Sequence, residues 1–158
     1  MGLAKARWAM FLLAICVVTL LAYGAWSFQM SALDEPGPAV TFLATKAKHF
    51  YIGLAARQIR VVPPSSPASI AVGEMAYHGE CQNCHGTDGR TPTEIGRSLY
   101  PRAPSLVSPQ VQRWSDPELF VIIRDGIRHS GMPGFGRAVS GNQIWDLVRF
   151  VRSLQKSS

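Results

Sequence analysis

The pentapeptide Cys81-Gln82-Asn83-Cys84-His85 constrains this chain more than any other feature. Two thiols separated by two residues and followed at once by an imidazole form the C-x-x-C-H attachment signature of a c-type haem. This spacing lets both thiols reach the two vinyl groups of one porphyrin, and the next residue then falls beneath the iron. Histidine is a standard proximal ligand of haem iron. We therefore expect Cys81 and Cys84 to bind one haem c covalently and His85 to ligate its iron.

Two other chemistries are compatible with the same motif. A C-x-x-C pair can be a redox dithiol, and two cysteines with a histidine can contribute three ligands to a zinc site. The fourth zinc ligand would have to be His78 or His129, and nothing in their spacing recommends either. The continuation Gly86-Thr87-Asp88-Gly89 and the downstream Gly131-Met132-Pro133-Gly134 favour haem over both alternatives.

The N-terminal segment predicts a membrane anchor. It carries no charged residue between Trp8 and Leu33 and is almost wholly apolar as far as Trp26. At about 1.5 Å per residue, the two tryptophans would lie about 27 Å apart on a helix, close to the hydrocarbon thickness of a bilayer. Tryptophan at both ends resembles an interfacial aromatic belt. We expect residues 1–30 to be an uncleaved anchor that spans the membrane over about residues 8–28.

Basic residues precede this segment, and they predict its orientation. Lys5 and Arg7 would remain in the cytoplasm under the positive-inside rule, so that everything after Leu33 lies outside. A cleavable signal peptide is the main alternative, with residues 11–21 as its apolar core and Ala22-Tyr23-Gly24 as its exit. The apolar character continues beyond that exit for longer than a signal peptide needs, which favours the anchor.

Cys16 invites a third interpretation of the N-terminal segment. Together with Leu13, Ala14 and Ile15 it resembles the lipid-attachment motif of a lipoprotein, but Ile15 stands where a small residue is expected. We interpret Cys16 as an ordinary small hydrophobic residue of a membrane helix. All three interpretations place the haem motif outside the cytoplasmic membrane, in the periplasm.

Residues 31–68 are expected to form a juxtamembrane segment and linker. The run Asp34-Glu35-Pro36-Gly37-Pro38 would break the membrane helix, and Pro63-Pro64-Ser65-Ser66-Pro67 is typical of a stiff, extended linker. Between these runs, four residues recur at heptad-like spacing: Leu43, Ala47, Phe50 and Leu54. We interpret the segment as a tether with some helix in it. The alternative is a basic amphipathic helix that lies on the outer membrane face or against a partner subunit.

Residues 69–158 form the predicted haem domain. This length is short for a self-sufficient hydrophobic core, and a covalent haem would supply its centre. We predict three helices: one from an N-cap at Ser69 to about Glu80, one after an N-cap at Ser115 to about Asp125, and one that starts at Ser140. Stretches rich in proline and glycine are predicted to be loops, and strand-like alternation is absent. The predicted fold class is therefore all-α, preceded by a transmembrane helix.

From about residue 69 to residue 154, the chain resembles a class I cytochrome c domain. Gly73 and Tyr77 stand eight and four residues before the first motif cysteine, and Leu147 and Phe150 stand three apart in the last predicted helix. In that family, the first and last helices cross at these positions, and the small Gly73 would permit the close approach. The resemblance implies a small helical domain packed around covalent haem.

The resemblance also implies the surroundings of the iron. Pro104-Ser105-Leu106 resembles the family's Pro-x-Leu, whose proline carbonyl accepts a hydrogen bond from the proximal histidine and fixes its ring. Met132 lies in the loop where the family places its axial methionine, and such a ligand raises the reduction potential. His129, three residues earlier, is the alternative distal ligand and would give bis-histidine ligation.

The implied function is transfer of single electrons between redox proteins, not catalysis. The formal net charge of +6 is spread along the chain, and no basic stripe with interleaved aromatic residues indicates nucleic-acid binding. One alternative is a fixed haem-bearing subunit of a larger membrane complex, such as a quinol oxidoreductase, an oxidase or a dehydrogenase. A second is a haem enzyme of the peroxidase type, which needs an open iron position that an axial Met132 would fill.

Overall fold

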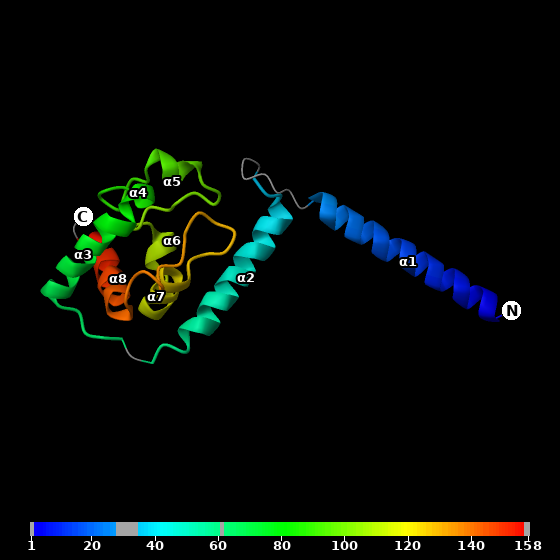
Figure 1. Cartoon of the computed structure of the whole chain (residues 1–158), viewed down its shortest axis with the longest axis horizontal. Coiled ribbons are helices and arrows are strands. Elements are labelled where there is room, and N and C mark those ends of the chain that lie inside the picture. Colours follow the sequence, from blue (N-terminus) through cyan, green and yellow to red (C-terminus); the bar gives the residue numbers. More distant parts are fainter. Residues whose placement is uncertain (1, 28–34, 61, 157–158) are drawn as a thin grey trace. The chain divides into compact units, whose positions relative to one another are not determined.

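A computed structural model describes residues 2–27, 35–60 and 62–156, and every regular element among them is an α-helix (Figure 1). The predicted all-α fold class is therefore confirmed. The chain divides into two compact units, Met1–Gly37 and Pro38–Ser158. The second unit contains the haem motif and positions the candidate site.

The first unit contains helix α1, Gly2–Ser27. Its stretch Lys5–Gly24 has a mean hydropathy of 2.0 and is long and apolar enough to cross a membrane. The Thr19 hydroxyl donates to the carbonyl oxygens of Ile15 and Cys16, at 2.8 and 2.9 Å, so this polar group is satisfied within its own helix. Helix α1 is thus a candidate membrane span, and position 28 of the predicted span lies outside the described residues.

The second unit contains seven described helices. In chain order, they are α2 (Pro38–Ala56), α3 (Pro67–Glu80), α4 (Gln82–His85), α5 (Glu94–Ser98), α6 (Pro109–Gln112), α7 (Asp116–Asp125) and α8 (Gly141–Lys156). The three helices predicted for the haem domain correspond to α3, α7 and α8. Helices α4 to α6 are four or five residues long, too short to show a helical period in the sequence.

The N-caps of the longer helices show where the sequence prediction succeeded and where it failed. Ser115 caps α7 and forms a capping box, because its backbone N–H donates to Glu118 Oε2 at 2.8 Å. The predicted N-cap of α3, Ser69, is wrong: Ser66 is the cap. The Ser69 backbone N–H donates to Ser66 Oγ at 3.1 Å, and Pro67 occupies the first turn, where its fixed φ and missing N–H cost nothing.

Helices α3 and α8 cross at Gly73, as predicted. A Cβ atom on Gly73 would lie 2.0 Å from the carbonyl oxygen of Asp146, so the two backbones touch where the glycine has no side chain. Four residues further along α3, the buried Tyr77 ring packs 5.0 Å from the Phe150 ring of α8, centroid to centroid. The crossing places the C-terminal end of α3, and hence the motif that follows it, against the core.

The core of the second unit is built mainly from α7 and α8. Its largest fully buried side chains are Tyr77, Val121, Ile144, Leu147 and Val148. The alternation of buried and exposed positions along α8 follows the helical period, because this helix lies between the core and solvent. The hydrophobic cluster also includes Trp145, which stacks at 4.6 Å on Phe120 of α7.

Helix α2 packs against α7, a contact that the sequence did not predict (Figure 1). Ile52 is 3% exposed at this contact, and the His49 ring stacks on Trp114 with centroids 4.4 Å apart. Near the start of α2, the hydroxyl groups of Thr41 and Tyr100 lie 3.1 Å apart. The compact unit therefore begins at Pro38, while the division between linker and haem domain at residues 68 and 69 stays a prediction.

We predict that Gly73→Ala will destabilise the haem-loaded protein by about 3 kcal/mol, because the added methyl group would force α3 and α8 apart. Gly79→Ala is the matched control, since it lies in the same helix and a Cβ there meets nothing within 4 Å. That change should be neutral, or stabilising by up to about 1 kcal/mol, because alanine is the better helix former. Guanidinium unfolding followed by far-ultraviolet circular dichroism measures both. Equal effects would contradict the close crossing.

Candidate haem site

The junction between α3 and α4 holds the C-x-x-C-H motif. Cys81 ends α3 and begins α4, because its backbone N–H donates to Tyr77 O at 2.8 Å while its carbonyl accepts from His85 N at 3.0 Å. Cys81, Cys84 and His85 are all half-buried. The motif is thus a single helical turn, and the turn sets the spacing of the two thiols and the imidazole.

Helix α5 folds back onto the motif and holds its backbone. Thr93 donates from its backbone N–H to Cys84 O at 3.1 Å and from its hydroxyl to Asn83 O at 2.6 Å. A Cβ atom on Gly96 would lie 2.1 Å from Cys84 O, so only glycine allows this approach. Neither residue was predicted from the sequence to belong to the site. The signal for Thr93 was present, since threonine followed by glutamate is a common helix start.

The segment after the histidine turns sharply through Gly86. Its φ of +82° favours glycine, and a Cβ there would lie 2.1 Å from Thr91 O. The buried Tyr77 hydroxyl donates to the carbonyl oxygen of Gly86. Asp88 accepts from the backbone N–H groups of Thr91 and Arg90, at 2.9 and 2.8 Å, and these hydrogen bonds lower the pKa of its carboxyl. The turn is fixed at both ends without involving the cysteines.

His85 is held in one orientation by a carbonyl group. Its Nδ1 atom lies 3.1 Å from Pro104 O, the contact that the family resemblance implied. Burial lowers the pKa of His85 below the ordinary value for histidine, and the hydrogen bond to Pro104 opposes this shift. At neutral pH, the imidazole is therefore uncharged, and Nδ1–H donates to the carbonyl. The Nε2 lone pair then remains for a metal ion, which is the donor that haem iron requires.

The environment of the Cys81 thiol does not favour a thiolate. Burial, Glu80 and Cys84 raise the pKa of the Cys81 thiol to about 12, whereas reactive and zinc-binding cysteines are thiolates. Among residues 2–27, 35–60 and 62–156, no group of three or more His, Cys, Asp or Glu side chains could hold a metal ion. The donor set fits covalent attachment of a porphyrin and one imidazole ligand.

Met132 lies in a loop that is tied to the end of α7. Its carbonyl accepts from Ile127 N at 3.1 Å, and its backbone N–H donates to Ser130 Oγ at 3.2 Å. A Cβ atom on Gly134 would lie 2.6 Å from Asp125 O, so the loop packs on α7 with no side chain between them. The Met132 side chain is half-buried and packs against the hydrophobic core.

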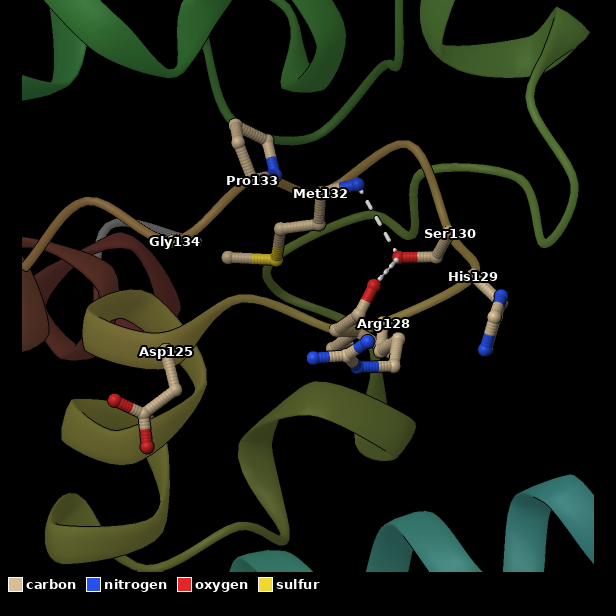
Figure 2. Close-up of a pocket in the computed structure, with 8 residues that line it drawn as sticks. Asp125, Arg128, His129, Ser130, Met132, Pro133 and Gly134 are labelled. Atoms are coloured by element: carbon tan, nitrogen blue, oxygen red, sulfur yellow. Dashed lines mark hydrogen bonds between the residues drawn. The ribbon is translucent and has the colours of Figure 1, made fainter.

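A cavity of about 280 Å³ lies beside this loop. Its lining comes from one continuous stretch that includes the end of α7: Asp125, Ile127, Arg128, His129, Ser130, Met132, Pro133 and Gly134. In Figure 2, the Met132 thioether extends toward Gly134, and the His129 ring is directed away from it. His129 is exposed and has a φ of +60°, whereas Met132 is oriented by its loop and by the core.

Both halves of the predicted site contact the hydrophobic core. Cys81, from the motif, and Met132, from the distal loop, both pack against the same hydrophobic cluster. Leu106, which follows Pro104 in the predicted Pro-x-Leu, belongs to that cluster, and its backbone N–H donates to Gly89 O at 2.8 Å. His129 is the one predicted candidate that remains exposed to solvent.

Two solved structures resemble part of this chain. A chain of the Kuenenia stuttgartiensis reducing HAO-like protein complex Kustc0457/Kustc0458 superposes with a TM-score of 0.55 at 20% identity, over 60% of this chain and 47% of that one. The present chain thus spans about half of that relative. The KustC0563 c-type cytochrome is 27% identical, with a TM-score of 0.47, over 52% of this chain and 96% of that one. No curated protein matches the chain.

The family model for cytochrome c oxidase, cbb3-type, subunit III matches residues 68–151, just over half of the chain. The match includes α3, the C-x-x-C-H turn, the distal loop and most of α8. Domains of this kind transfer electrons through haem c. The helical core, the motif that it presents and the extent of this match lead to one conclusion: the chain belongs to the cytochrome c family described as cytochrome c oxidase, cbb3-type, subunit III.

Proposed function

We propose that this protein carries single electrons through one haem c on the periplasmic face of the cytoplasmic membrane. Cys81 and Cys84 would form the thioether bonds, and His85 and Met132 would be the axial ligands. The observation that carries the proposal is the 3.1 Å contact between His85 Nδ1 and Pro104 O, which leaves Nε2 for the iron. The chain has one C-x-x-C pair, which provides for one haem.

The protein residues would determine how the site works. When bound, haem supplies a ferrous–ferric couple, and a thioether opposite histidine favours the reduced form. Pro104 O holds the His85 proton at Nδ1, so the ring keeps one tautomer and one orientation. Ser130 orients the Met132 backbone. With Met132 as a ligand, water and peroxide would be kept from the iron. These roles suit electron transfer and argue against peroxidase chemistry.

Membrane attachment is supported by α1. Its stretch Lys5–Gly24 can span a bilayer, and Lys5 and Arg7 at its start favour a cytoplasmic N-terminus. The haem domain would then lie in the periplasm, where it meets its redox partners. Electron-transfer encounters of this kind use small, transient contacts around an exposed haem edge.

A second candidate function is that of a fixed subunit in a larger redox complex. The family description names an oxidase subunit, and one similar structure comes from a reducing HAO-like protein complex. Purification from membranes in mild detergent distinguishes the two functions. A carrier would separate from other haem proteins, whereas a subunit would remain with them at fixed stoichiometry.

Covalent attachment predicts that Cys81→Ala, Cys84→Ala and His85→Ala will each prevent accumulation of normal holoprotein. Each change removes one of the proposed bonds to the cofactor. Denaturing gels stained for haem peroxidase activity, and compared with immunoblots of the same lanes, measure the covalent haem. Cys16→Ser is the control and should stain like the wild type. Equal staining of the Cys81→Ala/Cys84→Ala double variant would refute covalent attachment.

The distal ligand predicts different behaviour for Met132→His and His129→Ala. Ferric haem with methionine ligation shows a weak near-infrared sulfur-to-iron band. Met132→His should abolish this band and lower the reduction potential by roughly a few hundred millivolts, within the range that axial ligands span. His129→Ala should change neither property, because this side chain is exposed and directed away from Met132. If His129→Ala instead abolished the low-spin spectrum while Met132→Ala preserved it, the ligation would be bis-histidine.

The anchor predicts that the mature protein retains its N-terminal helix. Intact-protein mass spectrometry of the membrane fraction should give the mass of the chain with residues 1–24 still present, plus one haem. An N-terminus at residue 25 or nearby would show a cleaved signal peptide, and the haem domain would then be released in the soluble periplasmic fraction.

A further inference from the structure

Helix α2 has two apolar faces, and the described part of the second unit covers one of them. Ile52 lies on the covered face, against α7, and is 3% exposed. Ile59, beyond the end of α2, packs against the core. The docking of α2 is therefore part of the fold, and it accounts for Ile52, the one buried residue of this helix.

The opposite face carries a continuous apolar stripe that is exposed. Its members recur at alternating spacings of three and four residues, which places them along one side of the helix: Val40, Leu43, Ala47, Phe50 and Leu54. Phe50 is 75% exposed and Leu43 is 66% exposed. A helix that is apolar on two sides is ordinarily buried on both, and an exposed stripe of this size indicates an interaction surface.

The charged side chains of α2 and of the four residues after it are all basic, while the packed helix α7 brings the acidic Asp125 to the Tyr51 hydroxyl of α2. Lys46, Lys48, Arg57 and Arg60 are positive, and the sequence has no Asp or Glu from residue 36 to residue 62. The Lys46 ammonium lies 5.5 Å from the centre of the Phe42 ring, at the edge of the stripe. Aromatic side chains flanked by basic residues are typical of helices at the interface of an anionic membrane.

The position of α2 in the chain keeps it close to the bilayer. The candidate span ends at Gly24 and α2 begins at Pro38, so thirteen residues connect them. At roughly 3.4 Å per residue, even a fully extended connection would reach no more than about 45 Å. Because this connection is short, the effective concentration of α2 at the membrane surface would be very high.

We propose that the exposed stripe of α2 rests on the membrane surface, with its apolar side chains at the level of the lipid head groups and its basic residues on anionic lipid. The stripe contains no polar residue that would fix the register of a partner helix, which favours lipid over a protein groove. The haem domain is then held against the bilayer through α7 rather than swinging on a flexible tether. This proposal rests on the membrane attachment proposed above, but not on the haem ligands.

Cysteine alkylation in vesicles tests this contact. Phe50→Cys and Leu43→Cys are made in full-length, haem-loaded Cys16→Ser protein, with Gln110→Cys on α6, also exposed, as the matched control. The protein is reconstituted into phosphatidylcholine vesicles containing phosphatidylglycerol and treated with a polar maleimide. The two α2 cysteines should react on the order of tenfold more slowly than the control. This ratio is expected if α2 leaves the membrane surface for about a tenth of the time and its cysteines react only then. Vesicles without phosphatidylglycerol, or high salt, should reduce this protection.

Each other outcome overturns the proposal in a distinct way. Protein that floats with the vesicles but reacts equally at positions 50 and 110 would show that the stripe faces water. Protection that disappears when the protein is diluted into excess lipid would identify a second copy as the occupant. Protection found in native membranes but not in vesicles would identify a partner protein. Protein that fails to float would refute membrane attachment itself, independently of α2.

Discussion

The contact between the α3 and α8 backbones at Gly73 determines where the haem motif lies. Because Cys81 ends α3 without an intervening loop, the position of that helix sets the position of both thiols and of His85. Other contacts hold the C-x-x-C-H turn in this position. Thr93 donates hydrogen bonds to its backbone carbonyls, and Gly96 allows α5 to approach it closely. A single glycine contact, made by backbone rather than by side chains, thereby orients the chemistry of the domain.

The same arrangement separates haem attachment from the other uses of a C-x-x-C pair. A redox or zinc-binding cysteine needs a stabilised thiolate, which usually comes from a nearby cation or an exposed helix N-terminus. Cys81 instead has Glu80 as a neighbour and a largely apolar surrounding, and the pKa of its thiol is raised to about 12. Burial also keeps His85 uncharged. The environment thus keeps the Cys81 thiol and the His85 imidazole neutral, as suits a thiol that joins a porphyrin vinyl group and an imidazole that ligates iron.

Much of the fold was predictable because its signals are local. Ser115 with Glu118 marks the start of α7, and Gly73 and Tyr77 stand at fixed distances from Cys81. The failures concern signals that are ambiguous or non-local. Two serines three residues apart satisfy the same capping box, so the sequence alone did not distinguish Ser66 from Ser69 as the cap of α3. The docking of α2 depends on partners at positions 100, 114 and 125, which no local pattern of residues reveals.

Asp125, the last residue of α7, connects regions that are distant in sequence. The Tyr51 hydroxyl of α2 donates a long hydrogen bond of 3.4 Å to its carboxylate, while its backbone carbonyl lies against Gly134 in the loop that carries Met132. Phe135 N and Gly136 N continue this attachment through Ile123 O and Arg124 O, at 3.0 and 2.9 Å. Packed secondary structure transmits displacement with little loss. The end of α7 therefore joins α2 to the methionine loop through direct contacts, so a displacement of α2 would be passed to the segment that carries Met132.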